Sequence, residues 1–186
     1  GSVKSHWRIT TNESGFTFPL SVDGRFGSSV SALPDLDGDG NIELVVGQYL
    51  ADDARGAIWV LKLDDRGQVQ SALRTGSGTI GFDVLLDSGD RFGVSTAPLG
   101  DLDGDGTFEV AVGAHGDDDD GEPGTIGALV SDRGAVYIVS LDRNGAAVRT
   151  RKLVPGEGAI AGGGADFDSF GIQVATLGDL DADAVE

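Results

Sequence analysis

Residues 25–40 read RFGSSVSALPDLDGDG, and residues 91–106 read RFGVSTAPLGDLDGDG, so one pattern occurs twice at a spacing of 66 positions. In both copies an Asp-Leu-Asp-Gly-Asp-Gly run begins nine positions after the Phe. A third copy starts at Ser169-Phe170-Gly171 and continues into Asp-Leu-Asp-Ala-Asp at 179–183. Internal repetition with so long a period indicates a chain built from copies of one supersecondary unit.

The spacing between copies locates an insertion. The third Phe-Gly follows the second by 78 positions, and the extra residues lie between Gly113 and Gly134, because the corresponding Gly47 and Gly56 are only nine positions apart. The sequence thus predicts four segments. These are 1–24 (the end of a preceding unit and a loop), 25–90 (repeat 1), 91–168 (repeat 2, with the insertion 114–133) and 169–186 (a truncated repeat 3).

Each repeat contains four short runs rich in β-branched and aromatic residues, separated by Gly and Asp, which indicates strands. In the first repeat these runs are 27–33, 44–47, 57–63 and 68–75. Asp-Asp-Arg-Gly at 64–67 and Asp-Arg-Asn-Gly at 142–145 are typical of hairpin turns. We therefore expect an all-β fold of propeller blades with four antiparallel strands each. The chain would hold two whole blades, a flanking strand at about 2–9 and another after 169.

The composition excludes several classes of protein. The formal charge of −18 argues against nucleic acid as a partner, since phosphate binding requires a basic surface. No apolar run approaches the roughly 18 residues of a membrane span, so no membrane insertion is expected. Without Cys there is no disulfide, zinc–thiolate site or thiol nucleophile. The absence of an initiator Met and of a signal peptide favours a processed piece or a fragment made for expression.

The Asp-rich loops place carboxylates at positions 1, 3, 5 and 9, and a Gly at position 6 allows the loop to bend back. Position 7 can offer its backbone carbonyl. Four crowded carboxylates repel one another, and a flexible loop of oxygen ligands suits Ca²⁺ better than the smaller Mg²⁺. We expect two Ca²⁺ per chain, held by Asp35, Asp37, Asp39, Asn41 and Glu43, and by Asp101, Asp103, Asp105, Thr107 and Glu109. Asp179, Asp181 and Asp183 form an incomplete third site.

An EF-hand and an acidic turn without metal are the two alternatives to these calcium loops. An EF-hand requires a Glu at position 12, where this chain has Val46 and Val112, so that motif is excluded. An acidic turn that binds no metal stays open as the second reading.

Other motifs give no catalytic centre. Residues 76–81 spell Gly-x-Gly-x-x-Gly, but no room follows for the helix that a dinucleotide site needs. His6 and His115 stand in no hydrolase motif, so no enzyme is expected.

An acidic run and five aromatic residues remain, and most of them are expected to have structural roles. Asp117 to Asp120 are expected to form a solvated loop, or else a further cation or partner site. The other expectations are core positions for Trp59 and Tyr137, and packing between blades for Phe26, Phe92 and Phe170.

The Phe-Gly, Gly-Asp-Leu-Asp-Gly-Asp-Gly, Val-Gly-Ala and Gly-Ala-Val-Tyr-Ile motifs resemble the FG-GAP repeats of the integrin α-subunit propeller and of bacterial extracellular proteins. The resemblance implies calcium binding by the Asp loops on one face and partner binding on the opposite face. Strand parity places the insertion 114–133 on that opposite face, with the long loops 10–25, 76–91 and 154–169. Glu43 and Glu109 depart from the family, which usually has Asp at position 9.

The function expected from this resemblance is a calcium-binding adhesion or recognition module, extracellular or at the cell surface, with a protein or glycan partner. Two alternatives are a non-catalytic accessory propeller of a larger secreted enzyme and a purely structural repeat segment. Because two blades do not close a ring, we also expect either a longer chain or a homo-oligomer.

Overall fold

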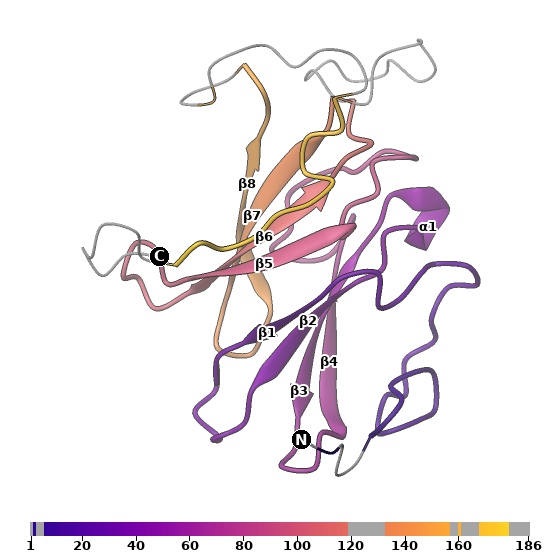
Figure 1. Ribbon diagram of the computed structural model, residues 1–186, viewed down its shortest axis with the longest axis vertical. Coiled ribbons are helices and arrows are strands. Elements are labelled where there is room, and N and C mark those ends of the chain that lie inside the picture. The colour runs from indigo at the N-terminus through magenta and orange to yellow at the C-terminus, as the bar shows by residue number, and fades with distance from the viewer. Residues whose placement is uncertain (1, 3–5, 119–132, 157–159, 161–167, 179–186) are drawn as a thin grey trace.

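The computed structural model describes residue 2 and residues 6–118, 133–156, 160 and 168–178. Two four-stranded antiparallel sheets hold nearly all the regular structure, and in each sheet neighbouring strands are consecutive in the chain (Figure 1). The first sheet comprises β1 (Val30–Leu33), β2 (Glu43–Gly47), β3 (Ile58–Leu63) and β4 (Val69–Thr75). The second comprises β5 (Ser95–Gly100), β6 (Phe108–Ala114), β7 (Ala135–Leu141) and β8 (Ala147–Leu153). The expected all-β fold of propeller blades is confirmed.

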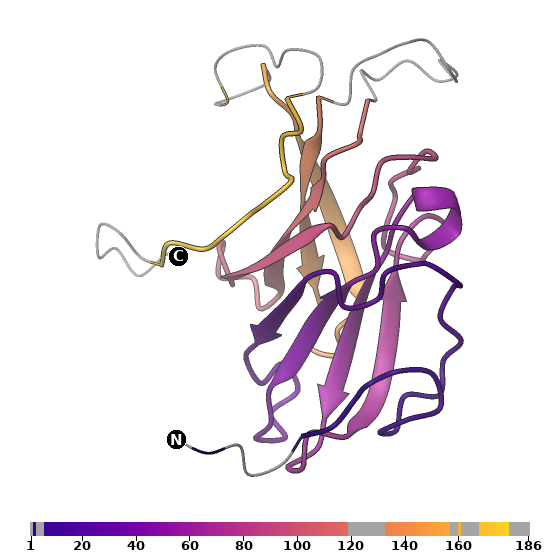
Figure 2. The same ribbon diagram turned by 45° about the vertical axis from the view of Figure 1, so that its right-hand side comes forward.

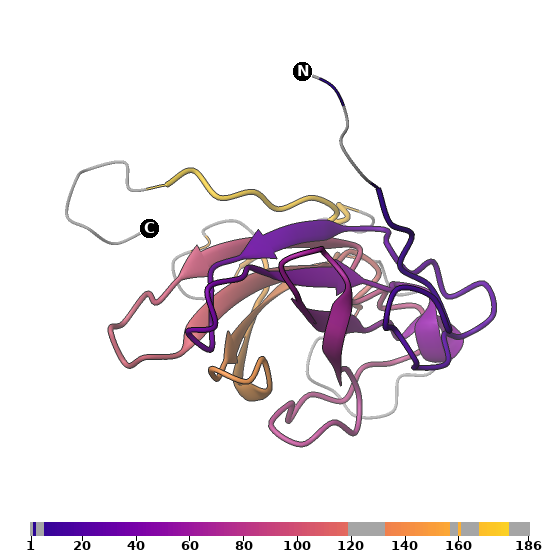
Figure 3. The same cartoon turned by 90° about the horizontal axis from the view of Figure 1, so that it is seen from below.

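Both faces of the first sheet are covered, which explains why its central strand is almost continuously apolar. Successive side chains of a strand point to opposite faces. Ile58 and Val60 therefore pack toward the second sheet, whereas Trp59 and Leu61 pack beneath residues 9–26. The two sheets lie side by side when the molecule is seen from below (Figure 3).

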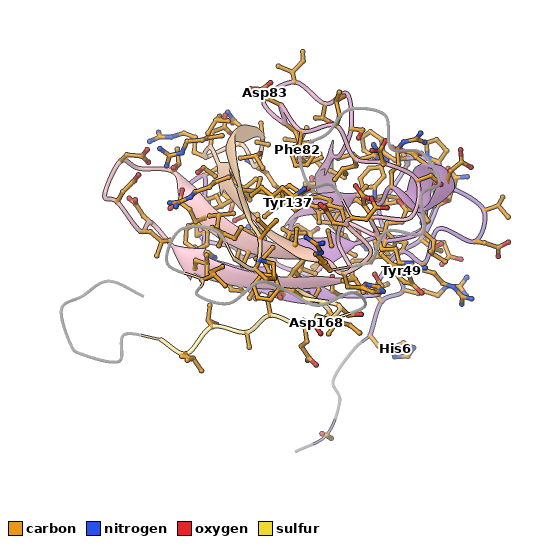
Figure 4. The ribbon with its side chains drawn as sticks, turned by 90° about the horizontal axis from the view of Figure 1, so that it is seen from above. His6, Tyr49, Phe82, Asp83, Tyr137 and Asp168 are labelled. Atoms are coloured by element: carbon orange, nitrogen blue, oxygen red, sulfur yellow. The ribbon has the colours of Figure 1, made fainter. Side chains whose placement is uncertain are left out.

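Aromatic side chains fill the space between the two sheets. The ring centroids of Phe82 and Phe92 are 5.1 Å apart, and Tyr137 lies 5.5 Å from Phe92 and 6.4 Å from Phe82. Phe82 and Tyr137 meet near the centre of the molecule (Figure 4). Trp59 is equally buried on the outer face of the first sheet, so the core roles expected for Trp59 and Tyr137 are confirmed.

The backbone of the second and of the third Phe-Gly pair docks against a glycine of the preceding repeat. Gly56 pairs with Phe92, and Gly134 pairs with Phe170, through isolated parallel bridges. A Cβ atom added to Gly56 or Gly134 would lie 2.0 Å from the carbonyl oxygen of Phe92 or Phe170, respectively. Only glycine permits this approach, and its positive φ (91° at Gly56) adds a second reason.

A serine hydroxyl strengthens the same junction in both repeats. Ser29 Oγ donates to the carbonyl oxygen of Gly93 at 3.0 Å, and Ser95 Oγ donates to that of Gly171 at 2.9 Å. The third Phe-Gly therefore docks on the second sheet as the second Phe-Gly docks on the first. The repeated sequence motifs are thus the residues that join one sheet to the next.

The flanking strands expected at the two ends are not observed. Residues 6–9 and 171–178 lie in no strand, and residues 3–5 and 179–186 are outside the described part of the chain. In each sheet the fourth strand pairs with the third, and the first strand pairs with the second. The described residues contain no third strand for the N-terminal segment and no second strand for the C-terminal segment. Without a neighbouring strand, the backbone N–H and C=O groups of a segment form no sheet hydrogen bonds. Nothing then holds the segment in the extended conformation of a strand.

The connection between β2 and β3 contains one helical turn that the sequence analysis did not predict, α1 (Ala51–Ala54; Figure 2). Asp52, Asp53 and Ala54 have φ values of 52°, 58° and 60°, which is the left-handed region. Residues at the boundary with the next repeat support this turn, because Ser88 Oγ donates to the carbonyl of Asp53 and Arg91 N donates to that of Ala54, both at 2.8 Å. Contacts distant in sequence therefore impose a conformation that local sequence does not signal.

The contact between Gly56 and Phe92 predicts that two Gly→Ala substitutions with similar backbone strain lower the free energy of unfolding by very different amounts. Gly78 has a φ of 79° and no atom within 4 Å of an added Cβ, so Gly78→Ala should cost about 1–2 kcal/mol. Gly56→Ala adds a collision with the Phe92 backbone and should cost at least about 3 kcal/mol. Urea unfolding of both variants measures the difference, and equal losses would contradict the junction.

Candidate metal sites

The first Asp-rich loop is folded by its own first carboxylate. Asp35 accepts hydrogen bonds from the backbone N–H groups of Gly38 (2.7 Å), Asp39 (3.0 Å) and Gly40 (2.8 Å). Gly38 and Gly40 have φ values of 83° and 90°, so the two glycines supply the turns that the loop requires. The bend predicted at position 6 is therefore present.

The second loop has the same local geometry. Asp101 accepts hydrogen bonds from Gly104 at 2.8 Å, from Asp105 at 3.1 Å and from Gly106 at 3.0 Å. The loops occupy equivalent places, between β1 and β2 and between β5 and β6, at the end of the sheets opposite α1 (Figures 1 and 2).

The carboxylates converge within each loop. In the first loop, one oxygen from each of four side chains lies within 4.8 Å of the others, and these side chains are Asp35, Asp37, Asp39 and Glu43. In the second loop the convergent set is Asp101, Asp103 and Glu109, and Asp105 is not part of it. The third candidate loop, with Asp179, Asp181 and Asp183, lies outside the described residues.

Glu43 carries the strongest sign of a missing ligand. It begins β2 at the base of the loop and is fully buried. Its Oε2 accepts the backbone N–H of Leu36 at 2.8 Å, whereas its Oε1 is buried without a hydrogen-bond partner among the described residues. A buried carboxylate oxygen left without a partner is costly. A cation among the loop carboxylates would supply that partner, so the residues fit a hard divalent metal.

The electrostatics of the first loop agree with this geometry. Burial, together with the nearby carboxylates of Asp37 and Asp35, raises the pKa of Glu43 above its usual value. The ammonium of Lys62, 2.7 Å from Asp37 Oδ2, lowers the pKa of Asp37. The loop therefore holds a buried carboxyl group whose negative charge is only partly balanced by the protein itself.

The residues at position 7 differ between the loops. Asn41 donates its backbone N–H to Asp39 at 2.8 Å. Thr107 donates its backbone N–H to Asp105 at 2.8 Å, and its hydroxyl also lies 2.6 Å from Asp105 Oδ1 and 3.0 Å from Glu109 Oε1.

Two cations next to the loops were not predicted from the sequence. Lys62 is the residue of β3 that pairs with Glu43 of β2. Arg149 of β8 lies opposite Ser140 of β7, and Ser140 in turn lies opposite Glu109 of β6. Both residues could have been found from the sequence by counting the antiparallel register outward from the loop glutamates. Register fixes which side chains are neighbours across a sheet.

The opposite end of the second sheet holds a buried polar network, which corrects one prediction. Asp117 was expected in a solvated acidic loop, but it is only 3% exposed. Tyr137 donates its hydroxyl to Asp117 Oδ2 at 2.5 Å, and Lys152 Nζ lies 2.8 Å from Asp117 Oδ1. These partners explain the burial, because a carboxylate can leave water when charged and polar donors replace it. Asp119 and Asp120 lie outside the described residues.

The histidines lie away from both Asp-rich loops. His6 is exposed near the start of the described chain (Figure 4), and His115 is half-buried with its Nε2 3.3 Å from Arg91 Nη1. No helix of the described residues is long and apolar enough to span a membrane.

Asp90 next to this network predicts a pH dependence of stability. Asp90 is 2% exposed, and burial, followed by repulsion from Asp117, raises its pKa to about 7. A raised carboxyl pKa means that the folded state binds the proton more tightly, so its stabilising contribution is complete below about pH 4 and is lost as the pH rises through 7. Asp90→Asn should therefore raise the melting temperature at pH 8 by roughly 5 °C and leave it nearly unchanged at pH 4.

The substitution keeps an oxygen that can accept the Asp87 N–H, which Asp90 now accepts at 2.8 Å. Melting curves of both proteins between pH 4 and pH 8 give the result, and parallel curves would contradict the buried, protonated Asp90.

The chain that carries these loops is similar in sequence to known proteins. Residues 26–61, which include β1, β2 and most of β3, match the family model "FG-GAP repeat". The chain is 35% identical over 95 residues to Integrin alpha-2 of Bos taurus and 42% identical over 94 residues to Integrin alpha-IIb of Homo sapiens. These matches cover 50% and 48% of this chain but only 8% and 9% of those relatives, so the chain spans less than a tenth of their length. Residues 26–61 therefore match an FG-GAP repeat, and the chain resembles integrin α subunits over about half of its own length.

Proposed function

We propose that this chain is a calcium-binding recognition module of the integrin-α type, working outside the cell or at its surface, and that it acts by binding and not by catalysis. In this proposal Ca²⁺ occupies the two Asp-rich loops and stabilises them. The relatives named as integrin α subunits support the extracellular location and the recognition role.

The observation that carries the metal proposal is the buried Oε1 of Glu43. The carboxylates of Asp35, Asp37 and Asp39 converge with Glu43, and exposed acidic loops alone would not require a metal. A fully buried glutamate with an oxygen that finds no hydrogen-bond partner in the described part of the chain is different, because the cost of burying it needs an explanation. Direct coordination of a cation removes that cost.

The residues proposed to hold Ca²⁺ are those of positions 1, 3, 5, 7 and 9. They are Asp35, Asp37, Asp39, the Asn41 carbonyl and Glu43 in the first loop, and Asp101, Asp103, Asp105, the Thr107 carbonyl and Glu109 in the second. The ion supplies two positive charges to a group of carboxylates and links the loop to the base of β2 or β6. Its role is structural, since it binds the folded loop and thereby stabilises the folded state.

The recognition surface is proposed to lie at the opposite end of the sheets. That end carries the connections between β2 and β3 and between β6 and β7, together with the loop that precedes β5. The left-handed turn α1 belongs to this end, and backbone conformations of this kind are frequent at binding sites. A protein or glycan is the class of partner that the resemblance to integrin α subunits favours.

Calcium titration of the whole chain tests the metal proposal. Isothermal calorimetry should show two Ca²⁺ per chain, and a chelator should lower the melting temperature of calcium-loaded protein by several degrees. Glu43→Gln retains an oxygen for the Leu36 N–H and replaces the buried Oε1 by an amide nitrogen. This variant should lose one of the two ions.

Asp65→Asn is the matched control, because it removes one negative charge from an exposed turn at the same end of the first sheet. It should bind calcium as the unsubstituted protein does. Absence of calcium heat in the unsubstituted protein, or equal behaviour of the two variants, would refute the proposed site.

The separation of the two ends gives a second test. Replacement of residues 119–132 by a short Gly-Ser linker keeps the buried Asp117 and changes only the connection between β6 and β7. Calcium uptake should be unchanged and the melting temperature nearly so, because closure entropy depends weakly on loop length. Calorimetry and melting curves measure both quantities, and a lost calcium ion would show that the two ends are not independent.

A further inference from the structure

The two Asp-rich loops differ in how far the protein already neutralises their carboxylates. In the first loop, the Lys62 ammonium contacts Asp37 Oδ2 at 2.7 Å, and no described residue donates a hydrogen bond to Glu43 Oε1. In the second loop, a single nitrogen of Arg149, Nη2, lies near three carboxylates. The distances are 3.0 Å to Asp103 Oδ2, 3.8 Å to Asp105 Oδ2 and 3.9 Å to Glu109 Oε1.

The threonine at position 7 adds to this difference. The Thr107 hydroxyl lies between Asp105 Oδ1 at 2.6 Å and Glu109 Oε1 at 3.0 Å, so it competes for the same oxygens that a metal would use. Its counterpart Asn41 contacts Asp39 through its backbone N–H, and no side-chain hydrogen bond of Asn41 is seen among the described residues. This explains why all four carboxylates converge in the first loop but Asp105 stands apart in the second.

The cause lies in an exchange of residues between neighbouring strands. Lys62 of β3 corresponds in the second sheet to Ser140 of β7, and Ser71 of β4 corresponds to Arg149 of β8. Because Ser140 is small, the longer Arg149 crosses it, with Nε 3.3 Å from Ser140 Oγ, and reaches the loop. A guanidinium offers several donors at fixed angles and can engage more carboxylates than an ammonium.

We propose that Arg149 is a tethered cation that competes with Ca²⁺ for the second loop, so that the loop at 35–43 fills first and the loop at 101–109 fills at higher calcium. This inference rests on the proposed calcium binding and concerns the order in which the two loops fill. Calcium must displace the Arg149 guanidinium and the Thr107 hydroxyl from Glu109. At the first loop Lys62 needs to release only Asp37, and its Nζ already lies 3.3 Å from a second acceptor, the Arg143 carbonyl.

Calorimetric titration with CaCl₂ tests the order. The unsubstituted chain should give two steps, of which the tighter disappears in Glu43→Gln and the weaker in Glu109→Gln. Arg149→Ala should strengthen the weaker step by roughly two- to fivefold, which is the scale expected for an exposed ion pair, and leave the tighter step unchanged. Arg149→Gln is a second variant of the same kind, in which a polar side chain is kept for folding.

Arg151→Ala is the matched control, because Arg151 lies two residues further along the same strand and changes the net charge equally. Thr107→Asn copies the first loop and should also strengthen the weaker step. The proposal is overturned if the Arg149 variants match Arg151→Ala, or if the two loops bind with equal affinity; in both cases calcium binding itself stands. Absence of any calcium heat would instead refute the proposed function and this inference together.

Discussion

The close approach of the second and third Phe-Gly backbones to a glycine of the preceding repeat is the contact on which the rest of the structure depends. Because Gly56 has no side chain, the Phe92 backbone can pair with it, and the Phe92 ring enters the core between the sheets. The same contact joins Phe170 to Gly134. A junction with this geometry fixes the position of each sheet against the next, so the loops at both ends recur in equivalent places.

The metal loops follow from that regularity. A fixed register places Glu43 at the start of β2, where burial keeps water from its carboxylate while the loop Asp residues remain at the surface. The chain carries 31 acidic and 13 basic residues, so few cations are available to balance such loops. Lys62 and Arg149 are the ones that the sheet brings near, and each balances part of its loop. The divalent cation is the natural complement of what these side chains leave unbalanced.

Much of this could be predicted from the sequence, because the signals are local or repeated. The strands at 30–33, 43–47 and 58–63 and the loop bend at Gly40 follow from alternation, turn residues and repetition. What was missed depends on contacts between strands and between repeats. The burial of Asp117 requires Tyr137 of β7 and Lys152 of β8. The left-handed turn at 52–54 requires support from Ser88, in the loop before β5, and from Arg91 of the next repeat. Such contacts join residues that are distant in sequence, so the pattern of a short sequence segment does not reveal them.

The most direct test of the account is to locate calcium in crystals of this chain by anomalous diffraction. The account predicts an anomalous peak among the carboxylates of Asp35, Asp37, Asp39 and Glu43, with Glu43 Oε1 coordinating the ion. It also predicts a second peak in the loop at 101–109 once calcium is high enough to displace Arg149. Crystals grown in millimolar calcium that show no peak at either loop, with Glu43 Oε1 still lacking a partner, would contradict it.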